Sequence, residues 1–173
     1  NGGILKLVGS TPVLISPEKP LNSSVKGITE SGGAIWFASQ SNGVLKIDSS
    51  GKTTLFSDAF KDLLVFSILA DGNNMLVGTN EGLLIFNIDK ASGTLNNKGR
   101  AFDEIPATKI LFLSKQDGVI YVGSEDEGLF ILEKKNEKLK LTRQYTTNDG
   151  IASNDIRSVL IDKEKNLWLA SFG

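Results

Sequence analysis

A short motif recurs along this chain at intervals of 40, 45 and 47 residues. Each copy has a large apolar residue, a second apolar residue, Gly or Ala, and then Ser or Thr. In the first three copies a few polar residues and a Gly-led apolar run follow. The copies begin at Trp36, Leu76, Tyr121 and Trp168. Repetition at this period is typical of solenoids, propellers and other arrays, so it constrains the fold more than any other feature.

The second repeat shows how one unit is expected to fold. Val65 to Ala70 is an apolar run of strand length, and Asp71 to Asn74 predicts a hairpin turn, because Asp, Asn and Gly tolerate left-handed backbone conformations. Met75 to Thr79 forms the returning strand, and Leu83 to Ile88 forms the third. A fourth strand is expected between Leu95 and Phe102. Four antiparallel strands in each repeat of this length predict propeller blades.

We therefore predict an all-β chain of about four four-stranded β-propeller blades, forming an arc of a larger propeller of about seven blades. The chain is expected to begin and end inside a blade, because Gly3 to Leu7 matches Gly43 to Ile47. The predicted units are a partial blade over 1–20, blades over about 21–62, 63–103 and 104–150, and a partial blade over 151–173. The alternative is a four-bladed ring, closed by pairing of the two partial blades.

The large residue of each motif is expected to pack between blades. This predicts that Trp36, Tyr121 and Trp168 are buried, although aromatic side chains also serve as stacking platforms for ligands. A small residue two positions later would let the large side chain of a neighbouring blade approach closely. These small residues are Ala38, Gly78, Gly123 and Ala170.

Composition excludes several kinds of chemistry. The chain has neither Cys nor His, so it lacks disulfides, thiol catalysis, cysteine-bound zinc and the commonest general base near neutral pH. Its formal net charge of -1 does not suit a nucleic-acid partner. No apolar run approaches the ~20 residues that span a bilayer, so this segment is not expected to contact a membrane. We predict no catalytic residue, no metal site and no cofactor.

The last repeat is the most specific part of the sequence. Asp149 to Val159, followed by Asp162 to Ala170, resembles the two-component regulator propeller repeat. Ala152 stands where that family commonly has Pro, and Lys165 where it has Gly. The resemblance implies the periplasmic, extracytoplasmic input region of a bacterial hybrid two-component sensor histidine kinase. In that family propellers of about seven blades precede a sandwich domain, a membrane helix and a kinase, and the ligands are oligosaccharides.

The loops that precede each first strand, or join the second strand to the third, share one face of a propeller. Because recognition concentrates on loops held by a rigid scaffold, this face is the predicted binding surface. The competing interpretation is local: Asn and Asp bond nearby backbone, Arg157 pairs with Asp155, and the acidic residues form a solvated loop. Asp48 to Gly51, Asp71-Gly72 and Asp117-Gly118 are assigned to turns alone. The candidate ligand-binding residues are Asn22, Asn154, Asp155, Arg157, Glu125 and Asp126.

These observations favour a non-catalytic, ligand-sensing propeller module. Two alternatives remain open at this point: a protein-interaction propeller scaffold, and an enzyme similar to propeller lactonases or lyases. The expected partners are an oligosaccharide and the remaining blades, supplied by the parent sensor protein or by a second chain.

Overall fold

The computed structural model describes residues 4–15, 21, 23–89, 91–96 and 98–173, and these residues form five antiparallel sheets. The N-terminal half-blade contains β1 (Ile4–Val8) and β2 (Thr11–Ile15). Blade 1 contains β3 (Val25–Ser31), β4 (Ala34–Ser39), β5 (Gly43–Ile47) and β6 (Thr53–Phe56). Blade 2 contains β7 (Val65–Asp71), β8 (Asn74–Thr79), β9 (Gly82–Asn87) and β10 (Arg100–Ala101).

Blade 3 contains β11 (Ile110–Gln116), β12 (Val119–Ser124), β13 (Leu129–Lys135) and β14 (Lys138–Tyr145). The C-terminal half-blade contains β15 (Asp155–Ile161) and β16 (Leu167–Phe172). The only helices among the described residues are two 3-10 turns, η1 (Asp58–Phe60) and η2 (Thr147–Asp149). The all-β prediction with four strands in each complete repeat is therefore confirmed.

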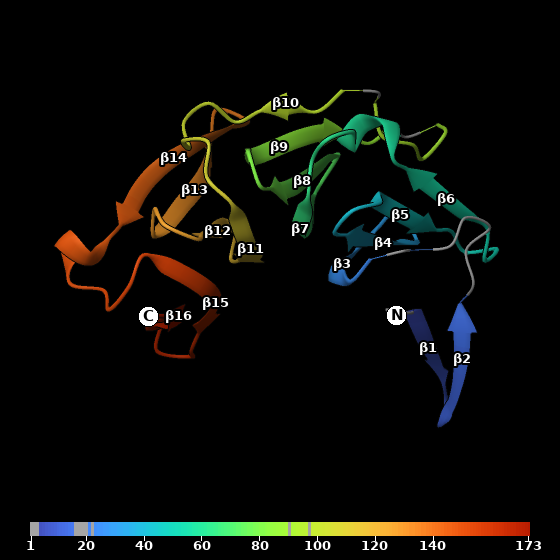
Figure 1. Cartoon of the computed structure of the whole chain (residues 1–173), viewed down its shortest axis with the longest axis horizontal. Helices are drawn as coiled ribbons and strands as arrows, with labels where there is room; N and C mark the ends of the chain where they lie inside the picture. Colours follow the sequence, from blue (N-terminus) through green and yellow to red (C-terminus); the bar gives the residue numbers. More distant parts are fainter. Residues whose placement is uncertain (1–3, 16–20, 22, 90, 97) are drawn as a thin grey trace.

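The sheets follow one another around an open arc, with the first strand of each blade on its inner side (Figure 1). β3 contacts β7, β7 contacts β11, and β11 contacts β15, so the inner strands form a continuous concave edge. Among the described residues β1 pairs with β2 alone and β16 with β15 alone. The arc prediction is confirmed and the self-closed ring is wrong.

The core consists of apolar layers between neighbouring blades. Trp36 is 1% exposed and packs in one cluster with Met75 and Phe86 of blade 2. Tyr121, at the matching position of blade 3, packs against the cluster that contains Ile156 of the C-terminal half-blade. The large residue of the motif therefore faces the following blade, and the burial predicted for Trp36 is confirmed.

Trp168 contradicts the same prediction, because 62% of its surface is exposed. Its motif position faces away from blade 3, toward the side on which a following blade would lie. No described residue covers that side, so the ring remains in solvent and its Nε1 donates a hydrogen bond to Asp162 Oδ2 at 2.8 Å. Leu160 and Phe172 of the same half-blade are 65% and 70% exposed.

The small residues of the motif lie where the next blade's inner strand comes closest. A Cβ added at Gly78 would lie 2.6 Å from the carbonyl oxygen of Ile110, and one at Gly123 would lie 2.6 Å from that of Ile156. We expected a large side chain to approach these positions, but the nearest atom of the following blade is a backbone oxygen. Blade spacing is therefore set by backbone as well as by side chains.

Candidate functional site

Each innermost strand carries a β-bulge near its start. The pairing register shifts between Val25 and Gly27 in β3, and at the matching position of β7, β11 and β15. One residue of each inner strand is therefore left without a partner opposite it, and bulges of this kind commonly re-aim a side chain at functional rims. The four extra residues are Lys26, Phe66, Leu111 and Arg157.

Arg157, a candidate from the sequence, is thus the bulged residue of the C-terminal half-blade. Its Nε lies 2.5 Å from Asp155 Oδ1, its Nη2 donates to Asp155 Oδ2 at 2.6 Å, and its guanidinium lies 5.5 Å from the Phe172 ring centroid. The structure brings Asp155 and Arg157 together as an ion pair, which is the local interpretation considered for them. The pair neutralises both charges at this rim.

Asn154 precedes the same strand and is engaged by local backbone. Its Oδ1 accepts a hydrogen bond from the Thr147 N–H at 2.8 Å, and its carbonyl oxygen accepts one from the Gly128 N–H at 2.9 Å. These bonds tie the loop before β15 to η2 and to blade 3. Asn22, the matching candidate before β3, lies outside the described residues.

The acidic candidates belong to the loop between β12 and β13. Glu125 pairs with Lys109, whose Nζ lies 2.5 Å from Oε1, and Asp126 Oδ1 accepts a hydrogen bond from the Thr108 hydroxyl. Glu125 and Asp126 therefore neighbour each other but bond different residues of the loop before β11. Among the described residues no group of three or more metal-ligating side chains is present.

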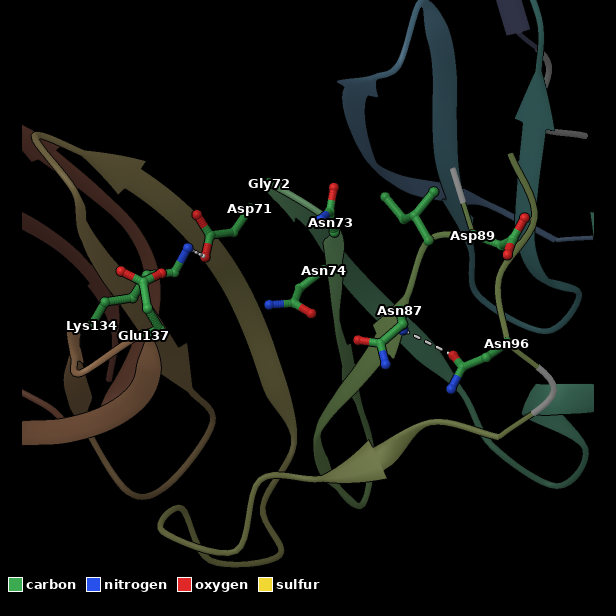
Figure 2. A pocket seen from close by; sticks show the side chains of 10 residues that line it. Asp71, Gly72, Asn73, Asn74, Asn87, Asp89, Asn96, Lys134 and Glu137 are labelled. Carbon is green, nitrogen blue, oxygen red and sulfur yellow. Dashed lines mark hydrogen bonds and ion pairs between the residues drawn. The ribbon is translucent and has the colours of Figure 1, made fainter. Parts of the chain in front are cut away.

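A different surface, between blade 2 and blade 3, is hollowed. A hollow of about 720 Å³ lies between the β7–β8 turn of blade 2 and the β13–β14 turn of blade 3 (Figure 2). An adjoining hollow of about 680 Å³ continues it outward between β9 and β10 on one side and β14 on the other. We call the two together the asparagine groove. Its asparagines are Asn73, Asn74, Asn87 and Asn96.

Asp71 closes one end of this groove. Its carboxylate is only 2% exposed and lies 2.5 Å from Lys115 Nζ and 2.9 Å from Lys134 Nζ, both on blade 3. Burial would raise the pKa of Asp71, but hydrogen bonds and charge from the two lysines outweigh it and hold that pKa below its ordinary value. Assigning Asp71 to turn formation alone was wrong, because it also joins two blades.

Other carboxylates of the groove are also held in the ionised form. The hydrogen bond from Lys140 lowers the pKa of Glu104, and the Leu141 N–H adds to this effect. Hydrogen bonds from the backbone and hydroxyl of Ser92 lower the pKa of Asp89. The carboxylates of Asp71, Asp89 and Glu104 are therefore all engaged by structural partners.

The sequence did not indicate this groove, because its asparagines occur at turns and strand ends, where Asn is common for backbone reasons. None of the candidates predicted from the sequence lines either of its hollows. The one available signal was the concentration of Asn in a single repeat. The described residues also contain no helix with the length and apolar character needed to cross a bilayer.

Comparison with known proteins agrees with the repeat and the fold. Residues 150–173 match the family described as two component regulator propeller, which confirms the resemblance seen in the last repeat. No curated protein sequence matches the chain.

Solved structures show the same fold at low sequence identity. The extracellular domains of two hybrid two-component systems of B. thetaiotaomicron superpose with TM-scores of 0.68 and 0.67, at 22% and 19% identity. Each match covers 98% of this chain, which spans only about a quarter of either domain (24% and 25%). A streptogramin B lyase has a TM-score of 0.58 at 14% identity, over 91% of this chain and 51% of the lyase. These likenesses show a β-propeller.

Proposed function

We propose that this chain is part of the extracytoplasmic sensor propeller of a two-component regulatory system, that it binds an oligosaccharide, and that it is not itself catalytic. The observation that carries the proposal is the regulator propeller repeat at residues 150–173. The sensor domains that share the fold support the same assignment. Absence of Cys is compatible with an oxidising compartment such as the periplasm.

The end surfaces of the arc support a role within a larger propeller. Leu7 and Leu14 of the N-terminal half-blade are 70% and 63% exposed, and Trp168 is exposed on the C-terminal half-blade. Contiguous apolar faces of this kind mark interaction surfaces. We propose that further blades of the parent protein, or of a second chain, cover both faces.

A binding role also agrees with the residues at the rim and in the groove. The likeness to a lyase reflects the fold, and a fold alone does not carry an activity. The chain offers no His or Cys for acid–base, nucleophilic or transition-metal chemistry. A ligand-sized polar groove needs neither residue to hold a sugar through hydrogen bonds.

A glycan array probed with the complete protein tests the proposal. We expect saturable binding of a neutral or acidic oligosaccharide, with the bound glycan recovered unchanged after prolonged incubation. Cleavage of the glycan, or turnover of a lactone, would establish an enzyme instead. Failure to bind any glycan would overturn the sensing assignment and leave the protein-interaction scaffold as the function to test.

A further inference from the structure

The asparagine groove exists because the outer strands of two neighbouring blades differ in length. β10 has two residues and pairs only with Ile85 and Leu84 of β9. β14, the outer strand of the next blade, has eight residues. The two adjoining hollows share Asn74, Asn87, Asn96 and Glu137, so they form one continuous channel along the blade boundary.

Free carboxamides line the first hollow, two of them at the point where it meets the second. Among the described residues no hydrogen bond engages the side chains of Asn73, Asn74 or Asn87, and Figure 2 shows Asn74 and Asn87 directed into the same space. Each carboxamide offers two donors and an acceptor with two lone pairs. Such groups match the alternating donor and acceptor character of sugar hydroxyls.

Unlike the other three asparagines, Asn96 uses its side chain in hydrogen bonds, and it covers the free edge of β9. Its Oδ1 accepts from the Asn87 N–H at 2.9 Å, its own N–H donates to the Asn87 carbonyl oxygen at 3.0 Å, and its Nδ2 donates to Lys98. An extended peptide would bind here by adding a strand to an open sheet edge. Because the backbone of Asn87 is already paired, this surface favours a ligand held by side chains.

The charges of the groove favour an uncharged ligand. Asp71 pairs with two lysines, and Glu104 pairs with Lys140 at 2.6 Å. The other charged residues that line the groove are two cations and three anions, and the second lysine on Asp71 supplies the balancing positive charge, so the charges sum to zero. The five residues are Arg100, Lys138, Asp89, Asp103 and Glu137.

From these observations we infer that the asparagine groove is a binding site for an uncharged oligosaccharide, with one sugar unit near Asn73 and Asn74 and the next between Asn87 and β14. The inference rests on the proposed sensing function and gives it a location. Each hollow has the size of a small-molecule site, and their continuity suits a chain of linked units better than a single sugar.

Calorimetry with the complete protein tests this location. Neutral and acidic linear oligosaccharides of ~2–8 units and their constituent monosaccharides are screened on an array, and the strongest binder is then titrated into wild type and variants. Asn74→Ala and Asn87→Ala should each weaken binding about three- to tenfold, and the double variant about 10- to 100-fold. Asn148→Ala, an exposed change on η2, serves as the matched control and should leave the dissociation constant unchanged.

The possible outcomes separate this inference from the proposed function. If an oligosaccharide binds wild type and the double variant equally, the groove is not the site, although the sensing function stands. If only acidic glycans bind, the uncharged-ligand assignment is wrong. If no glycan binds, both proposals fail. Where an Ala variant lowers the melting temperature, Asn74→Asp and Asn87→Asp replace it, because they keep the side-chain shape and remove the amide donors.

Discussion

Gly78→Ala tests how closely the blades are stacked. Gly78 lies in β8 opposite Ser67, and the inner strand of blade 3 passes directly over it. An added Cβ would lie 2.2 Å from Ser67 Oγ, 2.6 Å from the Ile110 carbonyl oxygen and 2.8 Å from Ile110 Cγ2. Ser67 can rotate away, but the Ile110 oxygen belongs to the backbone of a core strand and can move only with that strand.

The cost has two parts. Overpacking a well-packed core by one methyl group typically costs about 1–3 kcal/mol. Rotation of Ser67 also breaks the buried hydrogen bond from its Oγ to the Ile110 carbonyl oxygen, 3.2 Å long, which adds about 1 kcal/mol. We therefore expect Gly78→Ala to lower the free energy of unfolding by about 2–4 kcal/mol.

Urea denaturation of the complete protein measures this, with Ser67→Ala and the double variant as comparisons. Ser67→Ala removes the hydrogen bond alone and should cost about 1 kcal/mol. The double variant should remain clearly less stable than Ser67→Ala, because the new methyl group still meets the Ile110 oxygen. Equal stability of those two variants would show that Ser67 alone blocks the site, and the argument from backbone contact between blades would fail.

Three further changes test other contacts. Asp71→Asn should lower the free energy of unfolding by about 1–3 kcal/mol near neutral pH; the loss is no larger because both lysines are partly exposed to solvent. Because the pKa of Asp71 is lower in the folded state, its carboxylate contributes fully to stability above the ordinary pKa of 3.8, and this contribution disappears as the pH falls through the lower folded pKa. A stability difference between wild type and Asp71→Asn that grows on acidification would contradict this. Trp36→Ala should cost about 3–5 kcal/mol in thermal or urea unfolding, and no change would refute interblade burial. Trp168→Ala in the complete protein should cost a similar amount if a following blade covers it, whereas a loss below about 1 kcal/mol would show that this face stays open.

The strands were predictable because they depend on local sequence. The apolar runs and the Asp, Asn and Gly positions placed β7, β8 and β9 to within one residue. The short fourth strand of blade 2 lies inside its predicted range, although its two-residue length was not anticipated. Each of these features depends on periodicity and turn chemistry that a short window of sequence contains.

Contacts between blades could not be predicted in this way, because they join residues that are far apart in the sequence. Asp71 occupies a turn position, and nothing near it in the sequence indicates that Lys115 and Lys134 meet its carboxylate. The asparagine groove similarly depends on where β10 stops relative to β14. Trp168 shows the converse problem, because its motif predicts burial, yet 62% of its surface is exposed.

The recurrent bulge lets each inner strand keep its packing residues in place between blades while one additional residue varies. In an unbroken strand every residue alternates between the two faces, so a change in register would move all the packing residues to the wrong side. The bulge adds one residue to each inner strand, and the packing positions on either side keep their places. Lys26, Phe66, Leu111 and Arg157 differ in charge, size and polarity at this one position. Each of these four inner strands therefore has one position at which a substitution can change the side chain at the inner edge while the stacking of blades is preserved.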